Sequence, residues 1–218
     1  MRDAEVIILM RSRTWLVALS LWLALQAPAP LHAQGSAGES GGSPVPALQA
    51  LRLADDSGIH MDGRLDDEAW ASAVPVSDFT QQEPTEGGTP SRLTEIRVVY
   101  DADALYIGAM IHDDPDGILA HQKQRDAGLG TDDRFMWILD TFMDGRTGYF
   151  FEINAAGLMG DGLLSSGGGG FGGGGGRGGF GVNKSWDGIW EARVARVPDG
   201  WSAEIRIPFS TLNFDPTL

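Results

Sequence analysis

The strongest constraint on the fold is a pair of aromatic-rich apolar segments joined by a short connection rich in Asp and Gly. Residues 133–140 read Asp-Arg-Phe-Met-Trp-Ile-Leu-Asp, and residues 149–154 read Tyr-Phe-Phe-Glu-Ile-Asn. Asp144-Gly145 lies between them, and both residue types favour tight turns because Gly reaches positive φ freely and Asp hydrogen-bonds its own backbone. The pattern predicts a β-hairpin. Side-chain alternation places one set of residues on a single face: Phe135, Trp137, Leu139, Tyr149, Phe151 and Ile153.

Polar residues lie at the ends of these two predicted strands. We therefore expect the hairpin to form the centre of a sheet with an acidic rim. The rim residues are Asp133, Asp140, Asp144, Asn154 and Asp161.

Other segments with alternating apolar and polar residues also predict β-strands. Residues 94–100 and 105–112 predict one antiparallel hairpin, and residues 190–194 and 201–207 predict another around Pro-Asp-Gly at 198–200. One short helix is predicted at 67–73. Because strands follow one another with hardly any helix, the sequence predicts an all-β fold. We expect an antiparallel β-sandwich of the jelly-roll or immunoglobulin-like type.

The first 33 residues have the pattern of a secretory signal peptide. Arg11 and Arg13 precede an apolar run at 15–25, and small residues follow up to Ala33. A retained membrane anchor is the alternative. Residues 34–46 are rich in Gly, Ser and Pro and predict a linker, which leaves 47–218 as one domain. We expect the glycine-rich stretch at 165–181 to form a disordered insert, because glycine loses the most backbone entropy on ordering.

Charge and cysteine content exclude several classes of function. The formal net charge is −14, and no basic stripe is present, so binding to nucleic acid is not expected. The chain contains no Cys, which excludes disulfides, thiolate metal sites and a cysteine nucleophile.

Several short motifs are spread along the chain. They are Ile-x-x-Asp-Gly-x-Leu-Asp at 59–66 with Glu68 and Trp70, Arg-Asp at 125–126, Trp-Asp at 186–187 and Glu-Ile-x-Ile-Pro-Phe at 204–209. Together they resemble the family 9 carbohydrate-binding-module-like domain, in the version that lies at the N-terminus of exported bacterial proteins whose C-terminal part is an outer-membrane β-barrel. The resemblance covers residues 48–218 and implies a jelly-roll-like sandwich, carbohydrate binding, bound Ca²⁺ in some relatives, and a chain that is a fragment of a longer protein.

Sugar sites combine an aromatic face with planar hydrogen-bonding side chains, and this chemistry defines the candidate ligand residues. Trp186 is the stacking candidate because it precedes a predicted strand, whereas Trp137, Trp190 and Trp201 are in phase with inward-facing apolar residues. The predicted ligand-binding residues are Trp186, Asp133, Asp140, Glu152 and Asn154.

Two acidic loops supply the oxygen ligands that Ca²⁺ prefers. We therefore predict a calcium cofactor, with solvated turn-forming Asp as the alternative. The candidate metal ligands are Asp113, Asp114, Asp116, Asp140 and Asp144.

These observations predict a non-catalytic, carbohydrate-binding-like module of an exported envelope protein, located in the periplasm, outer membrane or extracellular space and associated with carbohydrate catabolism. The first alternative is a structural cap on the chain's own C-terminal barrel with the sugar site lost, because no Trp lies shortly before Asp133. The second alternative is a glycoside hydrolase or its accessory domain, with Glu152 as the candidate catalytic carboxylate.

Overall fold

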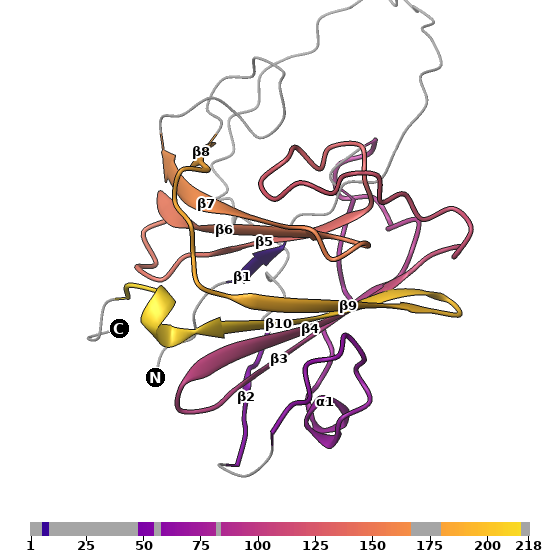
Figure 1. The fold of residues 1–218 in the computed structure, drawn as a ribbon, viewed down its shortest axis with the longest axis horizontal. Coiled ribbons are helices and arrows are strands. Elements are labelled where there is room, and N and C mark those ends of the chain that lie inside the picture. Colours follow the sequence, from indigo (N-terminus) through magenta and orange to yellow (C-terminus); the bar gives the residue numbers. More distant parts are fainter. Residues whose placement is uncertain (1–5, 9–47, 55–57, 82–83, 167–179, 215–218) are drawn as a thin grey trace, which may run out of the picture.

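The computed structural model describes residues 6–8, 48–54, 58–81, 84–166 and 180–214, and these residues form two stacked β-sheets (Figure 1). The prediction of an all-β sandwich with one short α-helix is confirmed. One sheet has the strand order β1-β5-β6-β7-β8, and the other has the order β2-β3-β4-β10-β9. The pairs are antiparallel except that β2 runs parallel to β3.

The strands of the three predicted hairpins, β3–β4, β5–β6 and β9–β10, lie close to their predicted bounds. The first sheet contains β1 (Val6–Ile8), β5 (Arg134–Leu139), β6 (Thr147–Asn154), β7 (Met159–Ser166) and β8 (Phe180–Asn183). The second sheet contains β2 (Leu51–Arg52), β3 (Thr94–Tyr100), β4 (Ala104–His112), β9 (Glu191–Val197) and β10 (Gly200–Pro208). The helices are α1 (Glu68–Ser72) and the 3₁₀ turn η1 (Phe209–Thr211).

The predicted central hairpin is β5–β6, which pairs from Arg134↔Asn154 to Leu139↔Tyr149. Its predicted inward face is confirmed, because the six alternating apolar residues are all buried in the core between the sheets. Trp137 stacks on Phe151 with ring centroids 5.4 Å apart and meets Trp190 edge to face at 5.7 Å. The prediction that Trp137, Trp190 and Trp201 belong to the core is also confirmed.

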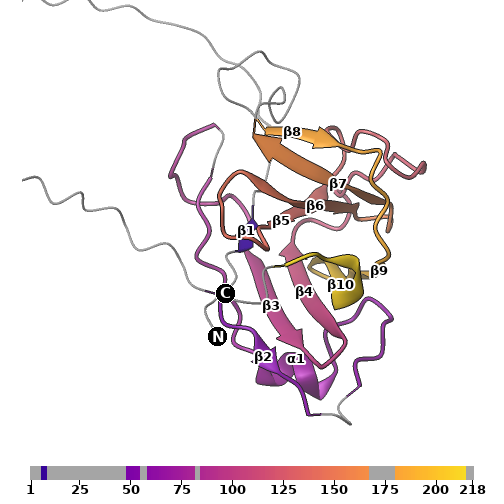
Figure 2. The same ribbon diagram turned by 90° about the vertical axis from the view of Figure 1, so that its left-hand side faces the viewer.

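The Asp62-Gly63…Trp70 motif, which leads into α1, packs on the outer face of the second sheet, as Figure 2 shows for α1 and β3. The Glu204 carboxylate on β10 accepts hydrogen bonds from the backbone N–H groups of Asp62 and Gly63 and from Trp70 Nε1, each at 2.8 Å. Gly63 has φ +93°, and a Cβ there would come within 2.5 Å of the Val194 backbone. The motif therefore fixes this segment to the sheet, and its residues serve the fold.

The N-terminal predictions lie mostly outside the described residues. Strand β1, which pairs with Trp137–Leu139 of β5, falls within the predicted signal peptide at 1–33. The predicted linker at 34–46 is outside the described part, and both assignments stay predictions. Of the predicted insert at 165–181, the first two residues belong to β7 and the last two to β8, and residues 167–179 are outside the described part.

A membrane-crossing helix would need both length and apolar character. No helix among the described residues has both.

Candidate ligand pocket

A pocket of about 410 Å³ lies at one end of the sandwich, where the inter-sheet core reaches the surface. Its floor contains Thr94, Ile111 and Trp201, which face each other across three neighbouring strands: Thr94 pairs with Ile111, and Ile111 pairs with Trp201. They are the outermost inward-facing residues of β3, β4 and β10. The volume is within the range of small-molecule sites, and we call this site the end pocket.

The segment before β3 covers one side of the end pocket. Val76 and Ile96 exchange two backbone hydrogen bonds of 2.8 and 2.9 Å, and the Leu93 carbonyl accepts the His112 N–H at 3.0 Å. The covering segment is therefore fixed to the sheet at both its ends. It contributes Phe79, Pro90 and several polar side chains to the lining.

Two buried donors in the floor lack a protein partner. Thr94 is 3% exposed and Trp201 is 1% exposed, and neither Thr94 Oγ1 nor Trp201 Nε1 has a hydrogen-bond partner in the part of the chain that the structure describes. Buried polar groups are normally hydrogen-bonded, and an unsatisfied one costs about 1–3 kcal/mol. Two further buried donors of the described part, Trp137 Nε1 and Trp190 Nε1, also lack a partner, but only Thr94 and Trp201 belong to the lining of the end pocket.

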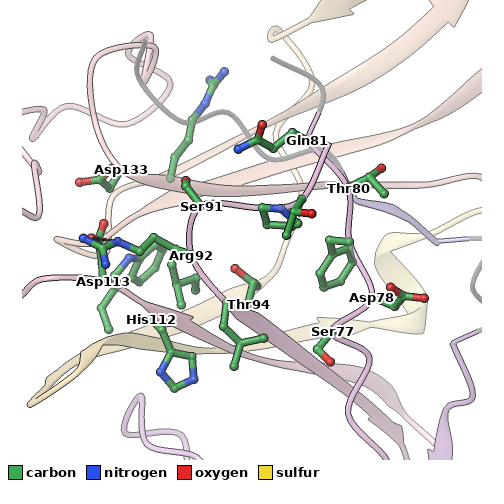
Figure 3. Close-up of a pocket in the computed structure, with 17 residues that line it drawn as sticks. Ser77, Asp78, Thr80, Gln81, Ser91, Arg92, Thr94, His112, Asp113 and Asp133 are labelled. Atoms are coloured by element: carbon green, nitrogen blue, oxygen red, sulfur yellow. Dashed lines mark ion pairs between the residues drawn. The ribbon is translucent and has the colours of Figure 1, made fainter. Parts of the chain in front are cut away.

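Charged side chains gather on one side of the end pocket. Figure 3 shows Arg92, Asp113 and Asp133 together on that side, with Thr94 between them and the Ser77–Asp78 side. Arg92 Nε lies 3.2 Å from Asp113 Oδ1.

Asp133 is a partly buried carboxylate on this charged side. Its Oδ2 accepts the Leu119 N–H at 2.6 Å. Burial raises the pKa of Asp133, and the negative charges of Asp113 and Asp132 raise it further, against the effect of the Leu119 hydrogen bond and of Arg196. The end pocket therefore contains a carboxylate, Asp133, whose negative charge is only partly offset by neighbouring donors and cations.

Of the five predicted ligand residues, only Asp133 lines the end pocket. Asp140 lies beyond the other end of β5, roughly 20 Å away at the usual rise of a strand. Its carboxylate accepts backbone N–H groups of the β5–β6 turn, including that of Gly145 at 2.8 Å. Asn154 lies near Asp133 but is fully buried, and its amide donates to Asp132 Oδ2 at 2.9 Å.

Glu152 and Trp186 have structural contacts in the first sheet. Glu152 is 1% exposed, and its two oxygens are each 2.7 Å from a cation, Arg134 Nη1 and Lys184 Nζ. Trp186 is partly buried and packs against Tyr149 with ring centroids 5.0 Å apart. The carboxylate is therefore shielded from solvent, and part of the Trp186 ring is used in packing.

The predicted metal ligands fall into two separate groups. Asp113, Asp114 and Asp116 follow β4, whereas Asp140 and Asp144 belong to the β5–β6 turn. Asp144 is exposed, and hydrogen bonds from the Thr147 and Arg146 backbone lower its pKa. Among the described residues, no group of three or more His, Asp or Glu is arranged to hold a metal ion. Calcium binding stays a prediction.

The sequence interpretation missed Thr94, Trp201, Arg92 and Phe79 as pocket residues. One signal was available for Thr94, because it is a polar residue in phase with the inward-facing Ile96 and Val98. Trp201 was assigned to the core correctly, but its position at the open end of β10 depends on the register with β4. Nothing local in the sequence gives that register.

Comparison with known proteins gave a distant likeness in fold. No family model matches the chain, and no curated protein matches it. One similar solved structure is a family 9 carbohydrate-binding module from Caldicellulosiruptor kristjanssonii in complex with cellotriose, with 15% identity, a TM-score of 0.48, and coverage of 73% of this chain and 67% of that chain. The same module in complex with glucose gives 16% identity, a TM-score of 0.48, and coverage of 77% and 72%.

Proposed function

We propose that this domain is a non-catalytic module that binds a carbohydrate in the end pocket. The single observation that carries the proposal is the end pocket with two buried, unpartnered donors in its lining, Thr94 Oγ1 and Trp201 Nε1. In the described part of the chain, Trp137 Nε1 and Trp190 Nε1 are also unpartnered but lie in the core outside the lining. Such donors favour a ligand that brings oxygen acceptors into a partly apolar site.

The rest of the lining suits a sugar. Phe79 and Pro90 offer apolar surface to the C–H face of a pyranose ring. Arg92, Asp113 and Gln81 offer planar groups that can donate to or accept from neighbouring hydroxyls. A ligand ring held between these two kinds of surface would place hydroxyl oxygens at the floor.

The experiment is a calorimetric titration of the full chain with neutral mono- and oligosaccharides, including glucose and cellotriose, with and without EDTA. We expect binding for at least one sugar. Binding heat that disappears in the presence of EDTA would support the predicted calcium cofactor. No binding heat with any sugar under either condition contradicts the proposal.

Thr94→Val tests whether the Thr94 hydroxyl in the pocket floor contributes to ligand binding. It removes one hydroxyl with little change in shape, so affinity should fall about 3- to 10-fold, as expected for one neutral hydrogen bond. The free energy of unfolding should stay the same or rise, because the free protein no longer buries an unsatisfied hydroxyl. Thr131→Val makes the same chemical change at an exposed position outside the lining and should leave affinity unchanged.

A structural role without a ligand is the second candidate function. It is favoured by the engagement of Asp140, Glu152 and Asn154 in the protein's own hydrogen bonds and ion pairs. The same titration separates the two candidates, since a structural module gives no heat with any sugar.

A further inference from the structure

The cations that line the end pocket are already matched by carboxylates. Arg92 lies 3.2 Å from Asp113, and Arg134 lies 2.7 Å from Glu152. Both distances are those of ion pairs. Little positive charge therefore remains in the lining to attract an anionic ligand.

The carboxylates that line the end pocket are not all matched. Asp133 accepts a backbone hydrogen bond from Leu119 but has no ion pair among the described residues. The negative charges of Asp113 and Asp132 disfavour the ionised form of Asp133. The positive charge of Arg196 favours it, but the Arg196 side chain donates a hydrogen bond to the Pro115 carbonyl at 3.5 Å. Figure 3 shows Asp133 on the same side of the end pocket as Arg92 and Asp113, and Arg92 is already paired with Asp113.

We propose that the end pocket selects an amino sugar, whose protonated amine pairs with the Asp133–Asp113 side while its hydroxyl oxygens accept from Thr94 and Trp201. The proposal rests on the proposed carbohydrate-binding function and names its substrate class. The two ends of the ligand are not interchangeable, because an ammonium has donors only and cannot satisfy the donors of the floor.

The cost of an uncompensated charge explains the preference. Burial near a like charge disfavours the ionised form of Asp133, which is why its pKa is raised. A ligand ammonium would remove that cost and form a charge-assisted hydrogen bond, which is stronger than the bond made by a neutral hydroxyl. A uronic acid would bring a third carboxylate to the same side, in a chain whose net charge is already −14. We therefore expect anionic sugars to bind more weakly than neutral ones.

The test is calorimetric titration of the full chain with glucosamine, glucose, glucuronate and ethanolamine at low ionic strength. Glucosamine should bind about tenfold more tightly than glucose, a factor that corresponds to about 1.4 kcal/mol. Glucuronate should bind more weakly than glucose. Ethanolamine supplies the amine without the ring, and it should bind more weakly than glucosamine because the floor donors stay unsatisfied.

Asp133→Asn tests the group directly. The Asn side-chain oxygen can still accept the Leu119 N–H, so the variant should fold, which circular dichroism checks. Its affinities for glucosamine and glucose should become equal within about twofold. Asp103→Asn makes the same chemical change at an exposed position outside the lining and should preserve the tenfold preference.

The pH dependence follows from the same group. Below its raised pKa, Asp133 is protonated and cannot pair with an ammonium, so the preference for glucosamine should grow as pH rises through that pKa, above the ordinary Asp value of about 3.9. The glucose affinity should change less over the same range.

The outcomes distinguish this inference from the proposed function. Equal affinity for glucose and glucosamine, a preference that persists in Asp133→Asn, or ethanolamine binding as tight as glucosamine binding would each overturn the amino-sugar assignment. In the first two cases the carbohydrate-binding function stands. No binding of any of the sugars overturns both.

Discussion

Glu204 is fully buried, yet its carboxylate is saturated with donors from the protein. Asp62 N–H and Gly63 N–H bond one oxygen, and Trp70 Nε1 bonds the other, all at 2.8 Å. Burial raises the pKa of Glu204, and the three hydrogen bonds act in the opposite direction. A single residue thus links β10 to the Asp62-Gly63 turn and to α1.

Glu204→Ala should strongly destabilise the domain. The change leaves three donors without an acceptor, and the loss in free energy of unfolding should be about 4 kcal/mol, which is large for a single substitution. Urea unfolding followed by tryptophan fluorescence measures it. Glu191→Ala is the control, because its ion pair with Arg193 is exposed and should contribute less than about 1 kcal/mol. A loss below about 1 kcal/mol for Glu204→Ala would contradict this role of the carboxylate.

At the scale of elements, a salt bridge attaches the β4–β5 connection to the first sheet. Arg125 Nη2 lies 2.7 Å from Asp161 on β7 and 2.9 Å from Asp187, while Asp126 accepts the Asp161 N–H at 3.3 Å. The Asp161 side chain is completely buried, and burial raises its pKa although Gly188 N–H and Arg125 lower it. The Arg-Asp and Trp-Asp motifs of the sequence therefore meet here in a structural role.

Arg125→Ala should loosen this connection and reduce the free energy of unfolding by about 2 kcal/mol at neutral pH, a moderate value because Arg125 is 40% exposed. The loss should shrink as pH falls. The pKa of Asp161 is higher in the folded state than in the unfolded state. At pH values between these two pKa values the folded state binds more protons than the unfolded state, so the free energy of unfolding falls as pH rises through this range. Removing Arg125 raises the pKa further.

Hydrogen exchange and urea titration at two pH values measure this effect. Lys123→Ala removes an exposed cation two residues away in the same connection and should change stability by less than about 0.5 kcal/mol. An Arg125→Ala deficit that grows on acidification would contradict the assignment of the effect to the Asp161 charge.

The elements that the sequence predicted well are those in which alternating apolar residues reach the inter-sheet core. The 94–100 strand was predicted with its exact bounds, and the central hairpin was predicted with the correct inward face. Strand β7 was not predicted, because Gly160 and Gly162 interrupt any alternation. A Cβ at Gly160 would meet Glu152 at 3.1 Å, and one at Gly162 would meet Val182 at 2.6 Å. These glycines make room for neighbouring side chains that are distant in sequence.

The site was harder to predict than the fold. Asp133 and Glu152 were both predicted ligand residues. Asp133 lines the end pocket, but Glu152 is buried between Arg134 and Lys184. The partner of a polar side chain depends on strand pairing and loop placement, which the pattern of residue types does not contain. The pairing of Lys184 with Glu152 across 32 positions is an example.

At the scale of the whole molecule, the two ends of the sandwich differ. At one end the β5–β6 turn is held by the carboxylates of Asp140 and Asp144, and Tyr149 Oη accepts the Asn213 N–H at 2.8 Å. At the other end the core reaches a pocket floor with two unpartnered donors, Thr94 and Trp201. We therefore expect ligand binding at one end of the sandwich and structural contacts at the opposite end.

The indole N–H signal of Trp201 tests this account most directly. In ¹H–¹⁵N spectra of the chain, titration with glucose and glucosamine should shift that signal in a saturable way, because its N–H gains an acceptor on binding. The signals of Trp137 and Trp190 are the internal controls, since both are buried in the same core and neither residue lines the end pocket. A saturable shift confined to Trp201 is the predicted result. Saturable binding that leaves the Trp201 signal unchanged would contradict the assignment of the site to the end pocket.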